Sequence, residues 1–378
     1  MERLNRRNFV KKAMAGAAGA GAIAACGDGG SSGLVATANA AVQGPEVRWR
    51  LATSFPPSLD ILHGTAERIA ERVSSLTGGR FSIRVYAAGE IVPALQVMDA
   101  VQQGSVQAGF TPGYYYIGKN PALAFDASLP FGLTMRQHTA WLRYGGGSEL
   151  MEGVYGDFGI LPIPCGNTGT QMGGWFRQPI NGLSDLQGLR MRIPGIGGEI
   201  MSRLGVSVQV LGGPEIFPAL ERGAIDATEW VGPYDDEKLG FYSIAPNYYL
   251  PGWWEPGVGM TMQVSTAAWN ELPEVYQELL RTVCAEANGD MMARYDAENP
   301  LALERLVSEH GVTLRTFSDD ILEAAWRESS AYLEEQAAAD ATFRRVYDSW
   351  KPFRDMSFRY FAGNELNYAR FAFSRTVS

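Results

Sequence analysis

The sequence has few cysteines and few histidines, and these shortages exclude several kinds of protein. Of its 378 residues, 3 are cysteine and 3 are histidine. The fold therefore cannot depend on a framework of disulfides, and the wide separation of the histidines excludes the usual histidine-based zinc motifs. Cys165 and Cys284 are either bridged to each other or are two buried free thiols.

Basic residues are also in the minority. Lysine and arginine total 32 against 41 aspartate and glutamate residues, which gives a net charge of -9. A nucleic-acid-binding protein would need a basic face, so this balance argues against a nucleic-acid partner. The hydrophobic fraction of 46% and the mean hydropathy of -0.11 are typical of a soluble globular protein, and the length favours two domains.

Residues 1–40 have the pattern of an export signal. Arg6-Arg7 begins a twin-arginine motif, and the Ala/Gly-rich apolar run that follows is too short to span a membrane as a mature helix. Two processing sites compete: cleavage after Ala38-Asn39-Ala40, or lipidation of Cys26 in a sequence that resembles a lipobox. Both predict a periplasmic protein.

Alternating strand and helix patterns predict an α/β fold. The first set has strands expected at 47–52, 81–86 and 106–110 and helices at 59–76 and 93–103. A second set has strands expected at 159–164, 189–193, 206–210 and 227–230 and helices at 199–204 and 215–222. Gly195–Gly198 is expected to be a tight turn. Two such sets predict a ligand site in the cleft between them.

The remaining segments are mostly helical. His138–Met151 is expected to be one helix, and a strand is expected at 257–265. Pro273 should begin a helix that kinks or breaks at Asn299-Pro300. The tail that starts at Trp350 is rich in aromatic residues, which must be buried either against the chain itself or against a second copy.

Arg192 is a candidate for binding a carboxylate. It ends a short strand and precedes Pro194-Gly195, so its guanidinium can present two parallel donors. The other interpretation of such an arginine is a surface salt bridge, and that is the one expected for Arg190.

Glu229 and Glu255 are candidates for a charged site. Both stand in apolar surroundings, where a carboxylate is costly unless it is paired. The partner is an arginine, a ligand or a metal ion. If the two carboxylates and the Gln171 amide oxygen converge, they offer the oxygen ligands that calcium prefers. A glycoside hydrolase, with Glu229 and Glu255 as its two catalytic carboxylates, is the alternative from another class.

Four runs together carry a resemblance to a known family. They are GNTGTQMGGWF (166–176), LQGLRMRIPGIGGE (186–199), ALERGAIDATEWVGPYDD (219–236) and YYLPGWWEPG (248–257). From Val47 to its end the chain resembles the extracytoplasmic solute-binding proteins of TRAP transporters, in the branch that binds 2-oxo acids such as pyruvate, and lactate. The resemblance implies a receptor that delivers its ligand to the TRAP membrane subunits, and no enzyme.

The resemblance also implies a fold. It implies two α/β lobes joined by crossing strands and a long helix, with lobe I formed by residues 45–165 and part of 258–378, and lobe II by residues 166–257. A helical tail, residues 340–378, would follow. Some members dimerise by exchanging a C-terminal helix, so a homodimer through this tail is expected.

For the site, the resemblance implies a two-part grip on a small monocarboxylate. Arg192 would hold the carboxylate, with Tyr115, Trp230 and Gln171 around the ligand. Gln171, Glu229, the Trp230 backbone carbonyl and Glu255 would surround a metal ion. In the sodium-binding pattern of the family the position of Glu255 holds glutamine, so the glutamate here favours Ca²⁺ over Na⁺. A larger or aromatic carboxylate is the alternative ligand.

Overall fold

The structure, a computed structural model, describes residues 41–375 of the chain. The predicted export signal and its processing sites at Cys26 and Ala40 lie outside the described residues. Within residues 41–375, no helix has the length and apolar character that crossing a membrane requires.

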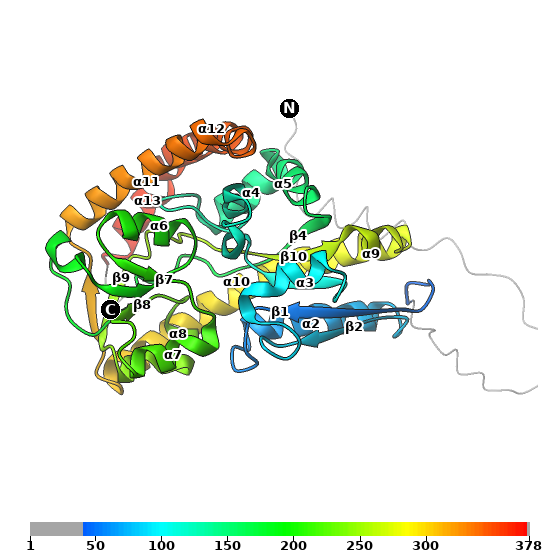
Figure 1. The fold of residues 1–378 in the computed structure, drawn as a ribbon, viewed down its shortest axis with the longest axis horizontal. Helices are drawn as coiled ribbons and strands as arrows, with labels where there is room; N and C mark the ends of the chain where they lie inside the picture. Colours follow the sequence, from blue (N-terminus) through cyan, green and yellow to red (C-terminus); the bar gives the residue numbers. More distant parts are fainter. Residues whose placement is uncertain (1–40, 376–378) are drawn as a thin grey trace, which may run out of the picture. The chain divides into compact units, whose positions relative to one another are not determined.

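A five-stranded sheet forms the centre of what we call the first lobe (Figure 1). Its strands run in the order β2 (Phe81–Tyr86), β1 (Val47–Thr53), β3 (Ala108–Thr111), β10 (Gly259–Ser265) and β4 (Ile160–Asn167). β1 pairs in parallel with β2 and β3, whereas β10 pairs antiparallel with β3 and β4. In β2, Phe81 and Ile83 are buried and Arg84 is exposed, which confirms the alternation that predicted this strand.

Short helices pack around the first sheet. They are α2 (Leu62–Leu76), α3 (Val97–Gln102), α4 (Met135–Tyr144), α5 (Gly147–Gly156), α9 (Thr266–Asn270) and the 3-10 turns η1 (Ala94–Gln96), η2 (Gly113–Tyr116) and η3 (Pro121–Asp126). Ala66, Ile69 and Val73 of α2 are fully buried, as the apolar stripe of this helix predicted.

A six-stranded sheet forms the centre of the second lobe. Its strands run in the order β11 (Thr313–Thr316), β9 (Asn247–Leu250), β5 (Trp175–Phe176), β8 (Ala227–Thr228), β6 (Arg190–Arg192) and β7 (Ser207–Gln209). Its helical elements are η4 (Leu183–Leu186), α6 (Gly195–Arg203), α7 (Gly213–Glu221), α8 (Pro233–Leu239) and η5 (Phe241–Ser243). β6 pairs in parallel with β7 and β8, so the carboxyl ends of β6 and β8 lie at the same edge, where α/β folds bind ligands.

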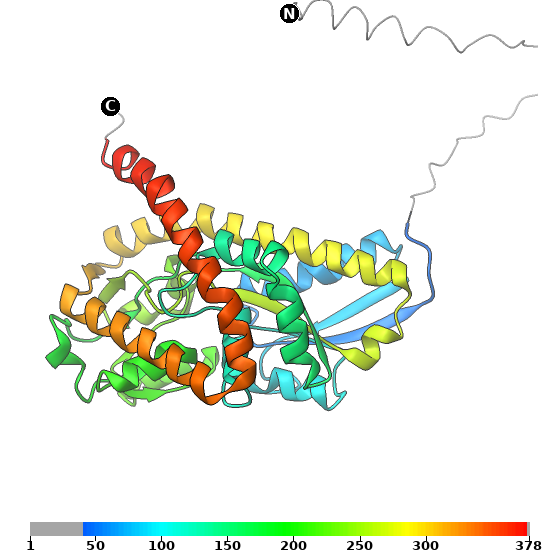
Figure 2. The same ribbon diagram turned by 90° about the horizontal axis from the view of Figure 1, so that it is seen from above.

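The two sheets are joined by loops and by one long helix. The chain passes from β4 to β5 through residues 168–174 and returns from β9 to β10 through residues 251–258. It passes to the second sheet again along α10 (Glu274–Ser308), the long yellow helix of Figures 1 and 2. The loop connections carry Gln171 and Glu255, so these candidate site residues lie where one lobe continues into the other.

Helix α10 corrects one prediction. Its 35 residues continue through Pro300, although Asn299-Pro300 was expected to break or kink the helix. Proline removes one backbone hydrogen bond. Here Ala302 and Leu306, beyond the proline, are fully buried, and the Asn299 side chain accepts a 3.0 Å hydrogen bond from the Tyr234 nitrogen of α8. Tertiary packing thus keeps the helix continuous.

Two glycine-containing segments also differ from the predictions. His138–Met151 contains parts of two helices, α4 and α5, because Gly146 adopts φ 82° between them. Gly195–Gly198 is the beginning of α6 instead of a separate turn. A Cβ atom on Gly197 would lie 2.7 Å from the Trp254 Cβ, so this glycine permits close packing of the helix.

The C-terminal helices are only partly buried. After α11 (Asp319–Ala339) come α12 (Ala341–Gly363) and α13 (Glu365–Ala372), orange to red in Figure 2. Trp350 packs against Phe125 with 5.8 Å between ring centroids and is 2% exposed, so this part of the tail folds back onto the chain. Phe371 and Phe373, farther along, are 65% and 84% exposed.

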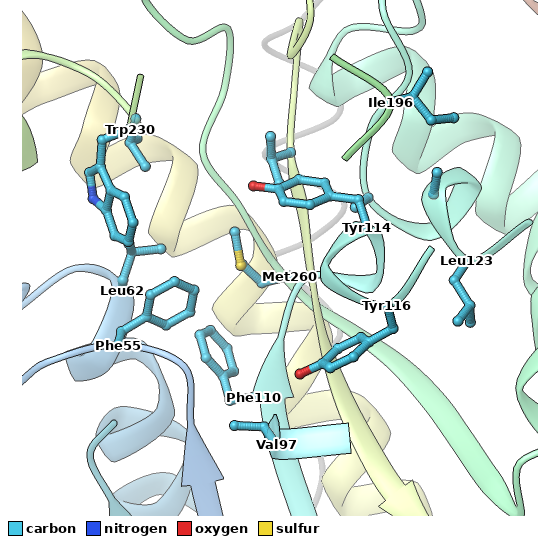
Figure 3. Close-up of a cluster of buried hydrophobic side chains, with 14 of the residues drawn as sticks. Phe55, Leu62, Val97, Phe110, Tyr114, Tyr116, Leu123, Ile196, Trp230 and Met260 are labelled. Atoms are coloured by element: carbon cyan, nitrogen blue, oxygen red, sulfur yellow. The ribbon is translucent and has the colours of Figure 1, made fainter. Parts of the chain in front are cut away.

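The buried apolar core continues from one lobe to the other. Figure 3 shows Phe55 and Phe110 of the first lobe beside Trp230 of the second, with Met260 of β10 close to them. Cys165 and Cys284 are buried and free, so the unbridged alternative is the one found. The predicted α/β class is confirmed by the two sheets and their helices.

Candidate functional site

Arg192 lies at the carboxyl end of β6 and is 1% exposed. Its Nε donates to the Leu211 carbonyl at 3.0 Å, and its Nη1 donates to the Glu229 carbonyl at 3.1 Å and forms an ion pair with the Glu229 carboxylate. Its Nη2 is buried without a partner among the described residues. The interpretation of Arg192 as a surface salt bridge is therefore wrong, whereas Arg190 does form one, with Asp226 at 2.6 Å.

Glu229 follows β8 and is also 1% exposed. Burial raises the pKa of its carboxyl to about 7, although the Arg192 charge acts in the opposite direction. A turn held by Asp236 places this residue: Asp236 Oδ1 accepts hydrogen bonds from the nitrogens of Val231 and Gly232, each at 3.2 Å. No pattern in the sequence identified Asp236 as a support of the site.

Glu255 lies in the loop that returns from β9 to β10 and is 3% exposed. Its Oε2 is buried without a partner among the described residues. Burial, and then the nearby Glu229 charge, raise the pKa of its carboxyl well above the usual value, while Arg192 lowers it. Two buried carboxylates thus face one buried guanidinium. When both are ionised the site has an uncompensated negative charge, which favours an additional cation.

Gln171 lies in the loop that leads from β4 to β5. Its Nε2 donates to the Thr168 hydroxyl at 3.1 Å, which leaves its Oε1 buried and without a partner among residues 41–375. The Gln171 nitrogen donates to the Glu255 carbonyl at 3.2 Å. The loops that carry these two residues are therefore joined directly, as the hypothesis of a shared site requires.

Tyr115 belongs to η2 of the first lobe and is half-buried. Burial raises the pKa of its hydroxyl to about 12, although the nearby Arg192 charge acts to lower it. Tyr114 packs against it in an edge-to-face geometry, with 5.1 Å between the ring centroids. The aromatic run Tyr114-Tyr115-Tyr116 after Pro112-Gly113 indicated possible walls of the cleft, and only Tyr115 was predicted to bind the ligand.

Trp230 covers Arg192. The Arg192 guanidinium carbon lies 5.1 Å from the indole ring centroid, a cation–π geometry, and the indole packs nearly perpendicular to the Phe55 ring, with 6.4 Å between ring centroids. The Trp230 Nε1 is buried without a partner among the described residues. A Cβ on Gly213 would lie 2.8 Å from the indole, so glycine is needed there to make room for this ring.

These residues offer a metal ion oxygen atoms only. Among residues 41–375, no group of three or more His, Cys, Asp or Glu side chains could hold a metal ion. A site for zinc, with thiolate or imidazole ligands, is therefore not supported here. The unpaired Gln171 Oε1 and Glu255 Oε2, together with the surplus negative charge, fit a hard cation instead.

Comparisons with known proteins show which family and which proteins this chain is similar to. The model of the family described as bacterial extracellular solute-binding protein, family 7, matches residues 52–340. The chain is 54% identical over 330 residues to the monocarboxylate 2-oxoacid-binding periplasmic protein of Nostoc sp., with 87% of this chain and 90% of that protein covered.

Two solved structures share the fold over most of their length. A TRAP transporter solute-binding protein from Bordetella bronchiseptica RB50 is 44% identical, with a TM-score of 0.86 and 88% and 98% of the two chains covered; it is a mixed-occupancy dimer with copurified calcium and picolinate. A TRAP periplasmic solute-binding protein from Pseudoalteromonas atlantica T6c, with bound sodium and pyruvate, is 38% identical, with a TM-score of 0.83 and 86% and 99% covered.

Proposed function

Because the chain belongs to the bacterial extracellular solute-binding proteins of family 7, the periplasmic receptors of TRAP transporters, we propose that its ligand is a small 2-oxo or 2-hydroxy monocarboxylate. The predicted two-lobed fold is confirmed by the shared folds, and the prediction that the protein is not an enzyme is confirmed by its family. The alternative of a glycoside hydrolase is therefore excluded. The twin-arginine type of the signal and lipidation at Cys26 remain predictions.

One observation carries the proposal of a carboxylate ligand. Among residues 41–375, Arg192 Nη2 is a charged donor without a partner, while Gln171 Oε1 and Glu255 Oε2 are acceptors without partners, and all three are buried. A buried charged donor without a partner is stabilised by an anion, and buried acceptors without partners are stabilised by a cation. A carboxylate bound together with a metal ion supplies both.

We propose that the metal ion is held by the Gln171 amide oxygen, the Glu229 and Glu255 carboxylates and the Trp230 backbone carbonyl. The ion would supply a positive centre that a carboxylate oxygen and a neighbouring C2 oxygen of the ligand can chelate together. Two carboxylates favour Ca²⁺ over Na⁺, because affinity for calcium increases with the charge of the ligands. Calcium in the Bordetella relative and sodium in the Pseudoalteromonas relative support a metal ion of either kind.

The ligand's remaining surface would meet aromatic side chains, those of Tyr114, Tyr115 and Trp230. The picolinate bound by the Bordetella relative supports an aromatic carboxylate as a second candidate. Picolinate has a ring nitrogen beside its carboxylate, and pyruvate has a C2 oxygen in the corresponding place. The shared chemistry is a carboxylate with a second donor atom on the adjacent carbon.

Thermal shift measurements with the purified protein test this proposal. Pyruvate, lactate, picolinate and propionate, which lacks the second donor atom, would each be added with calcium, with sodium, or with a chelator. Ligands that bind only the folded state raise its melting temperature. We expect pyruvate to stabilise and propionate not to, with the effect lost on chelation. Stabilisation by propionate equal to that by pyruvate would contradict the chelating ligand, and indifference to chelator would contradict calcium.

A homodimer is the second part of the proposal. An apolar groove of about 630 Å³ lies beside the C-terminal helices, lined by Thr134, Arg136, Met292, Phe358, Phe361 and Leu366. The exposed Phe371 and Phe373 lie farther along the same tail. We propose that a second copy covers these apolar surfaces; the mixed-occupancy dimer of the Bordetella relative supports this arrangement.

A further inference from the structure

A single loop of the first lobe carries two contacts to the second lobe. This loop, residues 54–61, connects β1 to α2 at the edge where the candidate site lies. Near its beginning, Phe55 is 2% exposed and packs edge-on against the Trp230 indole, as Figure 3 shows. Near its end, Asp60 reaches α8. The position of the loop thus depends on residues at both ends, only one of which is close to Arg192.

Asp60 is held by three side chains. The Tyr234 hydroxyl donates to its Oδ2 at 3.1 Å, and the Lys238 ammonium forms an ion pair with its Oδ1. Arg294 of α10 donates to the Asp60 carbonyl at 3.0 Å and to its Oδ2 at 3.2 Å. Both carboxylate oxygens therefore have charged or hydroxyl donors, two of them from the second lobe.

Helix α8 is coupled to the candidate site. It begins at Pro233, directly after the turn that contains Glu229 and Trp230, and Asp236 of α8 binds the backbone of that turn. Asp236 also accepts hydrogen bonds from Trp175 and Tyr248 of the second sheet, at 2.9 and 2.7 Å. When α8 moves relative to the first lobe, the second lobe and the candidate site therefore move with it.

The charges around Asp60 favour this contact. Partial burial by itself would raise the pKa of the Asp60 carboxyl, but Lys238, Tyr234 and Arg294 together lower it. The Lys238 ammonium also lies 3.8 Å from the centre of the Tyr234 ring. Because the Asp60 side chain is 48% exposed, salt should weaken the contact, as it does other ion pairs at a surface.

We propose that Asp60 is a positioning residue that holds the two lobes together through Tyr234 and Lys238 and so favours the closed arrangement that binds the ligand. This inference rests on the proposed function, because it concerns closure around that ligand. The apparent affinity of a two-lobed receptor is its intrinsic affinity reduced by the fraction of molecules that can close. Loss of the Asp60 contact therefore weakens ligand binding without removing any atom that would touch the ligand.

Asp60→Asn tests the inference, and Asp226→Asn is its matched control. Asp226 pairs with Arg190 at a comparable degree of exposure, but both residues belong to the second lobe. With pyruvate and calcium, we expect Asp60→Asn to raise the dissociation constant and the dissociation rate by roughly three- to tenfold. Asp226→Asn should leave both unchanged. As the salt concentration rises, the dissociation constant of wild type should approach that of Asp60→Asn.

A double-mutant cycle separates a specific contact from a general loss of stability. Lys238→Met alone should weaken binding as Asp60→Asn does, and the double variant should be little worse than either single one. Additive losses, wild-type affinity in Asp60→Asn, or equal losses in Asp60→Asn and Asp226→Asn would each overturn the inference.

A distance measurement tests lobe closure itself. Spin labels at Ile91→Cys in the first lobe and Val210→Cys in the second are suitable because both side chains are exposed, at 42% and 50%. We expect longer distances between the labels in Asp60→Asn than in wild type, and identical distributions would overturn the inference. If wild type binds neither pyruvate nor lactate, the proposed ligand is wrong, while the distances of the ligand-free variants still decide the role of Asp60.

Discussion

The main chains of Gln171 and Glu255 are hydrogen-bonded to each other, with 3.2 Å between the Gln171 nitrogen and the Glu255 oxygen. Each residue also has a buried side-chain oxygen without a partner among the described residues. The two loops that connect the lobes therefore meet at a pair of acceptors. A cation bound to these acceptors would therefore contact the two loops that connect the lobes as well as the second lobe.

Replacing the Glu255 carboxylate by an amide should change the choice of ion. We expect Glu255→Gln to weaken calcium binding by about tenfold or more, because one of two negative ligands is lost, while sodium still supports pyruvate binding. Titration calorimetry with each ion, in protein first treated with chelator, measures the change. A variant that keeps wild-type calcium affinity would show that Glu255 is not a ligand of the ion.

Removing the Arg192 guanidinium should affect binding and stability together. We expect Arg192→Ala to lose about 2–5 kcal/mol of carboxylate binding, and to unfold at lower temperature because Glu229 is left buried without its ion-pair partner. Arg192→Ala combined with Glu229→Gln should recover stability but not ligand binding. Arg190→Ala, in the same strand, is the control. Near-normal affinity in Arg192→Ala would disprove the carboxylate assignment.

Shortening the C-terminal helices should change the oligomeric state. A chain that ends at Ala362 keeps the buried Trp350 and removes the exposed Phe371 and Phe373. We expect it to be monomeric and folded, and the full mature chain to be a dimer, in light scattering coupled to size exclusion. Phe371→Ser with Phe373→Ser is the milder form of the same test. A monomeric full-length protein at micromolar concentration would contradict the dimer.

Asp126 should make stability depend on pH. Burial raises the pKa of its carboxyl to about 6, although the Thr261 and Tyr155 hydroxyls donate to it. The folded-state pKa is higher than the unfolded one, so the folded state binds more protons and its stability falls as pH rises from about 4 to about 6. The loss is on the order of 3 kcal/mol.

Asparagine has no carboxyl proton to lose, so the unfolding free energy of Asp126→Asn should lack this part of the pH dependence. Urea unfolding at pH 4 and pH 7 measures the difference in unfolding free energy between the two proteins. Because other carboxyls titrate in both proteins, only the difference between them is informative. Equal pH dependence in wild type and variant would show that the Asp126 carboxyl is not shifted.

Local sequence patterns predicted individual helices and strands better than they predicted which segments meet at the candidate site. The alternation in residues 81–86 was sufficient to place β2, and the turn after Met191-Arg192 was sufficient to place Arg192 at a strand end. Periodicity contains no information about which loops meet, so Gln171, Glu229 and Glu255 could be brought together only by the resemblance to a family. The hydrogen bond between the Gln171 and Glu255 loops is the physical reason why these two residues lie close together.

The failed prediction at Pro300 depended on distant contacts. Pro300 does not break α10, because Asn299 binds the backbone of α8 and residues beyond the proline are buried. Asp60 had no signal in the sequence, since an aspartate after a proline-rich loop is ordinary. Its partners Lys238 and Arg294 are more than 170 residues away, with sequence separations of 178 and 234.

Pro300 also has a mechanical consequence. An α-helix of 35 residues is about 52 Å long, and a continuous ladder of backbone hydrogen bonds would make it resist bending along that whole length. Proline leaves one bond of the ladder unmade. The bending stiffness of α10 is therefore lowest at the level of Asn299, where the helix contacts α8. The helix that spans both lobes is thus most compliant where the second lobe is attached to it.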